Sequence, residues 1–404
     1  MPGAAAADRR LLMEVEKGNL SGVKKLLAGG ANIDGSRELE YRPIISAARS
    51  GNATMLKLLI SNGADLEVPA RVPAGTRALH AAIAGEKLDA LRVLIDAGAY
   101  VDSKDGEGQT PLMQTSLATT NGAAMAQELL NALADPFAKN NNGMTAMHVA
   151  AGLGSVHIMR VVLAHTPSTL NKLENSGFTP LGIAALKGEQ GAVSYLLDAG
   201  ASDRGVHPDK AAIFWAAEGG HPDMVRLMLE YPIDSTGGLI AIPNAIGVAI
   251  QSHQTRMLDM LISVQGDGNR KKWAECRLRG GYPLNQACAW VCFRSVHVLL
   301  SAGASETYVD SSGSSARVDV GRAMAVHMRD PEREAALCRM LERGPAFRAR
   351  SFAWTAEVLA VDGGGGAASA SSGLERAAGA LGVSVYRPVG TRFFASRFER
   401  YVKK

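Results

Sequence analysis

Three histidines within residues 143–165 are the first side chains whose spacing suggests chemistry. His148, His157 and His165 stand in the otherwise small and apolar stretch GMTAMHVAAGLGSVHIMRVVLAH. Imidazole binds transition metals and also serves as a general acid or base near neutral pH. The stretch therefore predicts either a metal or catalytic site or a set of histidines that serve the fold. The choice depends on the helices that carry them.

A second candidate lies among the four cysteines, all of which fall in the C-terminal half of the chain. Cys288, Cys292 and His297 follow the pattern Cys-x3-Cys-x4-His, and Cys276 precedes them. Cys288 and Cys292 have the spacing that places two residues on one helical face, so a zinc site is one interpretation. The other is that these cysteines are small buried core residues, as free cysteines commonly are. We favour the second interpretation and expect no metal and no cofactor.

The sequence contains no known catalytic or phosphate-binding motif. We find no glycine-rich phosphate loop after a strand, no HExxH, no GxSxG and no lysine in a P-loop context. Four glycines at 363–366 run directly into AASASSG, and this composition is typical of a flexible linker over 363–373. We therefore do not expect the chain to be an enzyme.

The composition indicates a folded core with little net charge. The 404 residues are 47% hydrophobic but only 5% aromatic, so most burial must come from aliphatic side chains. A formal net charge of +4 is too small to favour nucleic acid as a partner. The N-terminus does not resemble a signal peptide, the apolar window Leu239–Ile250 is short and interrupted by Pro243 and Asn244, and the cysteine spacings are unlike a secreted disulfide framework. We expect a cytoplasmic protein, with the nucleus as a second possibility.

A repeated pattern organises most of the chain. Leucine-rich segments end in a small residue followed by Gly-Ala, as in LLAGGANID, LLISNGADLE, VLIDAGAYVD, LLDAGASD and LLSAGASE. The equivalent apolar residues are Leu27, Ile60, Ile95, Leu130, Leu163, Leu197, Leu229, Ile262, Leu300 and Leu341. Their steps are 33, 35, 35, 33, 34, 32, 33, 38 and 41 residues. Seven successive steps near one value indicate an array of stacked repeats.

A second signature opens each segment. The openings are RPIISAA at 42, RALHAAI at 77, TPLMQTS at 110, TAMHVAA at 145, TPLGIAA at 179, AAIFWAA at 211, NAIGVAI at 244 and YPLNQAC at 282. They resemble the Thr-Pro-Leu-His-x-Ala-Ala opening of ankyrin repeats, whose period is 33 residues. The resemblance covers residues 9–344 and implies an all-α ankyrin-repeat solenoid of about ten helix-turn-helix units, with projecting β-hairpin loops and divergent ends. The units open near 9, 42, 77, 110, 145, 179, 211, 244, 282 and 322, after a short lead of residues 1–8.

The fifth unit illustrates why such a repeat folds. A helix is expected from 146 to 153, Gly154 allows a turn, and an apolar stripe at helical spacing follows. Neither helix buries its apolar face alone, whereas stacking unit on unit buries both. The resemblance implies that His148 hydrogen-bonds near the helix start and the neighbouring turn. His157 is expected to face outward and His165 to lie near the end of the second helix, so the three histidines share no metal.

The resemblance also implies where a partner binds. Ankyrin arrays contact partners through hairpin fingers and inner helices, particularly the residue before each opening and the two after the alanine pair. At these positions stand Tyr41, Arg49, Met144, Leu153, Phe178, Leu186, Lys187 and Trp290. Exposed aromatic and apolar residues are typical of binding surfaces. We expect a groove centred on the fifth and sixth units, at Met144, Leu153, Phe178 and Leu186; the alternative is that each side chain packs on its neighbouring finger.

The loop between the eighth and ninth units departs from the repeat. The segment SVQGDGNRKKWAECRLRGGY is longer than the other loops and surrounds Trp273 with basic residues, namely Arg270, Lys271, Lys272, Arg277 and Arg279. It predicts either a basic finger that meets an acidic peptide or RNA, or a solvated loop with Trp273 tucked onto the array. We favour the solvated loop and keep Trp273 as a candidate contact.

The C-terminal extension, residues 345–404, is the second departure. It carries the excess positive charge and ends in GTRFFASRFERYVKK, where Phe394, Phe398 and Tyr401 are spaced for a short basic amphipathic helix. This end either docks on a partner or an acidic membrane surface, or covers the apolar face of the last unit. No other membrane contact is expected.

These observations predict a monomeric, non-catalytic scaffold or adaptor that binds a protein partner through its fingers and its concave inner-helix face. The alternative is a substrate-recognition subunit for a modifying enzyme such as a ubiquitin ligase, with the tail as recruitment element, although no F-box or SOCS-box pattern stands there. A host-directed effector is a third possibility. The partner itself depends on individual surface residues, because one scaffold serves unrelated functions.

Overall fold

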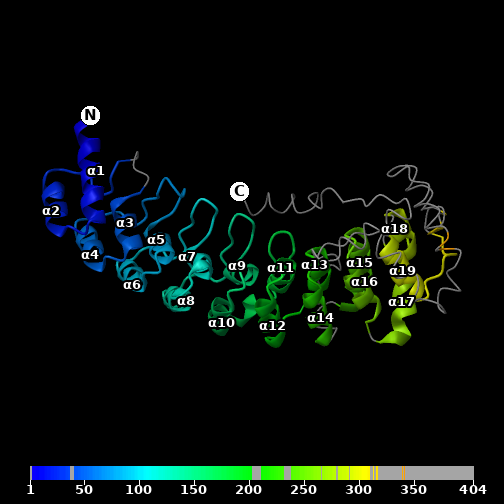
Figure 1. Cartoon of the computed structure of the whole chain (residues 1–404). Coiled ribbons are helices and arrows are strands. Elements are labelled where there is room, and N and C mark those ends of the chain that lie inside the picture. The colour runs from blue at the N-terminus through cyan, green and yellow to red at the C-terminus, as the bar shows by residue number, and fades with distance from the viewer. Residues whose placement is uncertain are drawn as a thin grey trace, which may run out of the picture. The chain divides into compact units, whose positions relative to one another are not determined.

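A computed structural model gives the fold of the chain (Figure 1). The structure describes residues 2–36, 41–202, 211–231, 238–264, 266–278, 281–290 and 292–309, and the single residues 313, 315, 316, 339 and 341. The chain divides into two compact units, Met1–Ala241 and Ile242–Lys404. The expected tenth repeat and the extension 345–404 lie outside the described residues, apart from Arg339 and Leu341.

The first compact unit is a series of helix pairs (Figure 1). The pairs are α1 (Pro2–Glu16) and α2 (Leu20–Ala28), α3 (Pro43–Ser50) and α4 (Ala53–Ser61), α5 (Ala78–Ala84) and α6 (Leu88–Asp96), α7 (Pro111–Gln114) and α8 (Gly122–Asn131), α9 (Ala146–Gly152) and α10 (Val156–His165), α11 (Pro180–Lys187) and α12 (Gln190–Asp198), and α13 (Ala212–Glu218) and α14 (Pro222–Glu230). Among the described residues of this unit, two 3-10 turns accompany them, η1 (Thr115–Leu117) after α7 and η2 (Pro167–Thr169) after α10. The inner helices α1 to α13 pack on one another in sequence, and so do the outer helices from α4 to α14. This is the stacked helix-turn-helix architecture that the period predicts.

The second compact unit continues with helices of the same kind. It contains most of α15 (Gly238–Gln251), then α16 (Thr255–Ile262), η5 (Asp267–Asn269), α17 (Arg270–Ala274), α18 (Pro283–Ala289) and α19 (Phe293–Ser301). The predicted interruption at Pro243 and Asn244 is wrong, because α15 runs through both residues. A proline removes only one backbone donor, and the fully buried Ile242 and Ile246 favour a continuous helix. Among the described helices, none is long and apolar enough to cross a membrane.

The fifth pair forms as its sequence predicts. Gly154 adopts φ +67° in the turn between α9 and α10, a conformation that glycine adopts without steric cost. Ala150 and Ala151 are completely buried on α9, as close helix packing requires, and Met159 and Val162 are buried on α10. The small residues and the apolar stripe therefore define the two faces along which neighbouring pairs stack.

The fingers between pairs are tight turns closed by backbone hydrogen bonds. In one finger the Asp105 N–H donates to the Gln109 carbonyl and the Gly108 N–H donates to the Asp105 carbonyl, both at 3.0 Å. The Asp105 carboxylate accepts from the backbone N–H of Glu107 at 2.9 Å and of Gln109 at 2.8 Å, which rigidifies the turn. Successive fingers also touch, since the Gly106 N–H donates to the Ala74 carbonyl at 2.8 Å.

The structure places residues 2–8, expected as a short lead, within α1. Asp8 is buried, and its Oδ1 accepts a hydrogen bond from the Asn32 backbone N–H at 3.0 Å. This bond ties the first inner helix to the loop that follows α2.

Gly75→Ala is expected to destabilise the first compact unit by about 2 kcal/mol, because an added β-carbon joins an unfavourable backbone conformation to a steric clash. Gly75 has φ +75°, and its β-carbon would lie 2.5 Å from the Gly106 nitrogen in the next finger. Gly63→Ala is the matched control: φ is +81° but nothing lies within 4 Å, so only the conformational cost of about 1 kcal/mol applies. Urea unfolding followed by circular dichroism measures both losses, and equal losses would contradict the close approach of the fingers.

Candidate functional site

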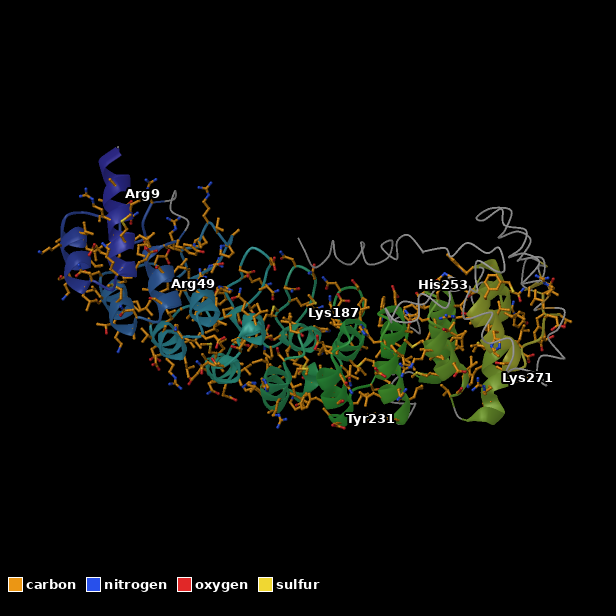
Figure 2. All side chains as sticks on the ribbon, viewed as in Figure 1. Arg9, Arg49, Lys187, Tyr231, His253 and Lys271 are labelled. Carbon is orange, nitrogen blue, oxygen red and sulfur yellow. The ribbon has the colours of Figure 1, made fainter. Side chains whose placement is uncertain are left out.

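The inner helices of the first compact unit end in accessible side chains at the positions that follow each alanine pair. Leu117 is 66% exposed at the end of η1 and Leu153 is 46% exposed after α9. Leu186 is half-buried in the last turn of α11, with Lys187 exposed beside it. Figure 2 shows Arg49 and Lys187 among the side chains of this unit. The first or second residue after the pair at the helix end is thus an accessible leucine in three neighbouring units, as the first residue in Leu117 and Leu186 and as the second in Leu153.

Leu117 is the residue of this set that the sequence interpretation missed. The pair at its register is Thr115-Ser116 instead of Ala-Ala, so the search for a residue after two alanines passed over it. The opening TPLMQTS would have identified it, because counting seven residues from Thr110 reaches Leu117, just as counting seven from Thr179 reaches Leu186.

Tyr41 and Arg49 form a pair that joins a finger to an inner helix. The Arg49 Nη1 donates to the Tyr41 hydroxyl at 3.1 Å, and the guanidinium carbon lies 5.6 Å from the centre of the tyrosine ring. Cation–π contact and hydrogen bond together restrict both side chains. Tyr41 is half-buried and Arg49 is exposed, so the pair presents a guanidinium group to solvent.

Phe178 is not an exposed anchor, so the prediction that it lines the groove is wrong. The side chain is only 8% exposed, because its ring packs on Trp215 of α13 with centroids 4.4 Å apart. The finger turns this residue toward the next helix pair instead of toward solvent. Met144, at the equivalent position one unit earlier, is half-buried. The alternative of packing between neighbouring units therefore holds for Phe178.

In the second compact unit, Trp290 is exposed and Trp273 is buried. Trp290 follows α18 and is 51% exposed. The indole N–H of Trp273 donates to the Val264 carbonyl at 3.2 Å, and Arg270 on the same short helix pairs with Asp259 at 2.6 Å. Trp273 thus lies tucked onto the array, and its interpretation as an exposed contact is wrong. Arg279 lies outside the described residues.

His148 has the structural role that the repeat predicts. Its Nδ1 accepts from the Thr145 backbone N–H at 3.3 Å and lies 2.8 Å from the Thr145 hydroxyl, so Nε2 carries the proton. Nε2 donates to the carbonyls of Lys172 at 3.0 Å and Phe178 at 3.2 Å in the neighbouring finger. Burial lowers the pKa of His148 to about 4, which keeps the ring neutral. His157 and His165 are exposed on α10.

The candidate zinc ligands among the cysteines lie in different environments. Cys288 is completely buried in α18, as a core residue, and Cys292 is buried at the start of α19. The Cys292 sulfur contacts the imidazole of His253, a partner that the Cys-x3-Cys-x4-His spacing did not indicate. Burial lowers the pKa of His297. Within the part of the chain that the structure describes, no three His, Cys, Asp or Glu residues are grouped to hold a metal ion.

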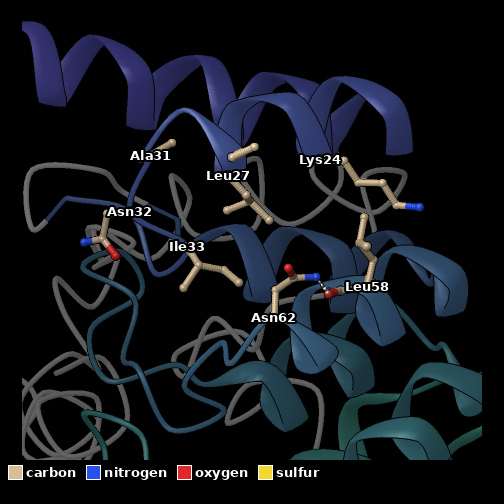
Figure 3. A pocket seen from close by; sticks show the side chains of 8 residues that line it. Lys24, Leu27, Ala31, Asn32, Ile33, Leu58 and Asn62 are labelled. Carbon is tan, nitrogen blue, oxygen red and sulfur yellow. Dashed lines mark hydrogen bonds between the residues drawn. The ribbon is translucent and has the colours of Figure 1, made fainter.

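An open groove lies between α2 and α4 (Figure 3). It measures about 590 Å³ and is lined by apolar residues such as Leu27, Ile33 and Leu58, with Lys24, Asn32 and Asn62 at its rim. The Asn62 amide donates back to the Leu58 carbonyl at 2.8 Å. No acid, histidine or cysteine lines this groove, and Lys24 is the one ionisable side chain among its lining residues.

Two kinds of comparison relate this architecture to known proteins. A family model of ankyrin repeats in three copies matches residues 11–105 and 112–206. The neurogenic locus notch homolog protein 1 of Xenopus tropicalis is 34% identical over 141 residues, which is 34% of this chain and 5% of that protein. Inversin of Canis lupus familiaris is 32% identical over 170 residues, or 41% of this chain and 15% of that protein. The chain thus spans only a small part of these relatives. The residues that align with the family model coincide with helices α2 to α12, and this part of the chain consists of ankyrin repeats.

Proposed function

We propose that the chain is a non-catalytic scaffold or adaptor that binds a protein partner through the ends of its inner helices and its fingers. Ankyrin repeats are a protein-interaction domain, which gives the general class of function. The exposure of Leu117 and Leu153 supports the proposal most directly. Neighbouring apolar side chains left in water are typical of an interaction surface.

The arrangement of these side chains suits one continuous partner segment. We call Leu117, Leu153 and Leu186 the leucine strip. Leu117 lies in η1, Leu153 directly follows α9 and Leu186 lies in α11, and α9 packs against both η1 and α11. Packed helices lie about 8–10 Å apart, so a single helix or strand of a partner can contact all three leucines. Lys187 beside the strip and the Tyr41–Arg49 pair further along the same unit add basic groups for polar contacts at its ends.

Leu117→Ala combined with Leu153→Ala is expected to weaken partner binding about thirty-fold, since two interface truncations of about 1 kcal/mol each add to about 2 kcal/mol. Affinity purification with mass spectrometry from cytoplasmic and nuclear extracts identifies partners of the wild type. Titration calorimetry with the recovered partner then measures the change in Kd.

Leu133→Ala is the control for this experiment. Leu133 is 85% exposed but follows the outer helix α8, away from the leucine strip. The control is expected to bind as the wild type does. Unchanged binding by a folded double variant would refute the strip as the interface. Removal of residues 345–404 tests the alternative, because a substrate-recognition subunit of a ubiquitin ligase would lose ligase subunits while keeping partners that need the strip.

A further inference from the structure

The turn between α15 and α16 brings an imidazole onto the cysteine at the start of α19. The Cys292 sulfur lies 2.7 Å from the Nδ1 of His253 and 3.4 Å from the Ile250 carbonyl oxygen. Cys292 is only 1% exposed, whereas His253, labelled in Figure 2, is exposed. The imidazole therefore covers a sulfur atom that the rest of the unit leaves next to the surface.

Part of this arrangement belongs to the repeat. Elsewhere the residue before an outer helix donates to a carbonyl of the preceding pair, as in Asn121 to Glu86 at 3.1 Å, Ser155 to Ser116 at 2.7 Å and His221 to Leu186 at 3.1 Å. Cys292 occupies the same register opposite Ile250. A thiol donating to that carbonyl would be a purely structural substitute for asparagine or serine.

The histidine is what the other registers lack. In most of the described helix pairs the residue before the cap of the outer helix is a glycine in the left-handed region, namely Gly18, Gly51, Gly154, Gly188 and Gly220. His253 holds this conformation at φ +56° and reaches the sulfur with its side chain. The second compact unit thus combines a thiol, a base in hydrogen-bond contact with it, and the N-terminal end of a nine-residue helix.

This combination is chemically distinct from a buried thiol. An adjacent imidazole accepts the thiol proton as sulfur attacks, and a helix N-terminus stabilises negative charge on the sulfur. Cys276 provides the contrast within the same unit, because burial raises the pKa of its thiol to about 12.

We propose that Cys292 and His253 form a reactive thiol–imidazole pair that undergoes S-thiolation by small-molecule disulfides. The sulfur of Cys292 attacks one sulfur of the disulfide, the S–S bond breaks and a new S–S bond forms. The proton of Cys292 passes to Nδ1 of His253 and then to the departing thiolate, which leaves as a thiol. The exposed His253 side chain moves aside only far enough to admit the disulfide, with Nδ1 still within reach of the sulfur, and the attached group then occupies the space that the ring leaves.

The test exposes the folded full-length chain to glutathione disulfide at neutral pH and follows each cysteine by peptide mass spectrometry. Cys292 is expected to gain the adduct about tenfold faster than Cys276, because the base and the helix terminus act on Cys292 alone. Cys276 reacting as fast as Cys292, or faster, would overturn the proposal without any variant.

The variant His253→Asn then tests whether His253 acts as a base toward Cys292 or only shields its sulfur from solvent. Asparagine tolerates the left-handed conformation and has no basic nitrogen. The reactive pair predicts about tenfold slower modification of Cys292, since general base assistance contributes at least this much. If the histidine is purely structural, its removal uncovers the sulfur and Cys292 is modified faster. Modification of Cys292 in the variant as fast as in the wild type, or faster, would therefore refute the reactive pair. Thermal unfolding verifies that the variant is folded, and a misfolded variant leaves the wild-type comparison to decide.

Discussion

Acidification from pH 7 to pH 4 is expected to remove about 3 kcal/mol from the stability of the first compact unit through His148 alone. Burial lowers the pKa of His148 to about 4, compared with about 6.5 in an unfolded chain. Between these values the unfolded state binds a proton that the folded state does not, so stability falls as the pH falls. A difference of 2.5 pKa units, each worth about 1.4 kcal/mol, gives this magnitude.

The hydrogen bonds of His148 explain why the folded state resists protonation. The Thr145 N–H already points at Nδ1, so a proton added there would face another donor. The bonds from Nε2 to two finger carbonyls favour the charged ring but only partly offset burial. Burial likewise lowers the pKa of His80, which donates to the Gln109 carbonyl at 3.0 Å. His80 therefore also lowers the stability of the folded state as the pH falls.

His148→Gln serves as the comparison, because its amide can form part of the same bonds but does not titrate. Urea unfolding of both proteins at pH 7, 6, 5 and 4 gives the difference in stability at each pH, in which the contribution of the carboxylates cancels. The wild type is expected to lose its advantage over the variant as the pH falls. A difference that stays constant from pH 7 to pH 4 would contradict the neutral buried imidazole.

The fold was predictable because it depends on many equivalent positions. The period, the alanine pairs and the histidine of TAMHVAA each recur or match a known opening, so errors at one unit do not change the architecture. The same reasoning failed at Pro243, where local propensity predicts a break but the buried faces on either side maintain α15. A repeat pattern specifies where helices stack more reliably than where each helix begins.

The candidate surface was less predictable, because exposure depends on where a neighbouring unit places its own side chains. Phe178 and Met144 share one register, but the ring of Phe178 packs at a tilt on the indole of Trp215 in the next helix pair. Leu117 was missed since its unit replaces two alanines with Thr115 and Ser116. The contact between His253 and Cys292 joins residues 39 positions apart, and spacing within a motif does not report such a contact.

Phe178→Ala is expected to destabilise the first compact unit by about 3 kcal/mol, as truncation of a buried phenylalanine in a packed core does. The lost contacts lie mainly on one side, where the ring packs on that of Trp215 with centroids 4.4 Å apart. The backbone of Phe178 is bound on the other side, through its carbonyl to His148 and its N–H to the Glu174 carboxylate at 3.0 Å. Phe178 therefore links the fifth, sixth and seventh helix pairs, so its truncation weakens coupling between neighbours as well as one contact.

Leu153→Ala is the control that separates this stabilising role from binding. Leu153 is 46% exposed, so its truncation is expected to change stability by less than about 0.5 kcal/mol while weakening a partner. Urea unfolding followed by tryptophan fluorescence suits the comparison, because Trp215 itself contacts the mutated ring. Phe178→Ala should shift the unfolding midpoint strongly and, in protein that is still folded, should spare partner binding. Normal stability together with lost partner binding would contradict this prediction. It would mean that Phe178 belongs to the interface and that its ring leaves Trp215 to contact the partner.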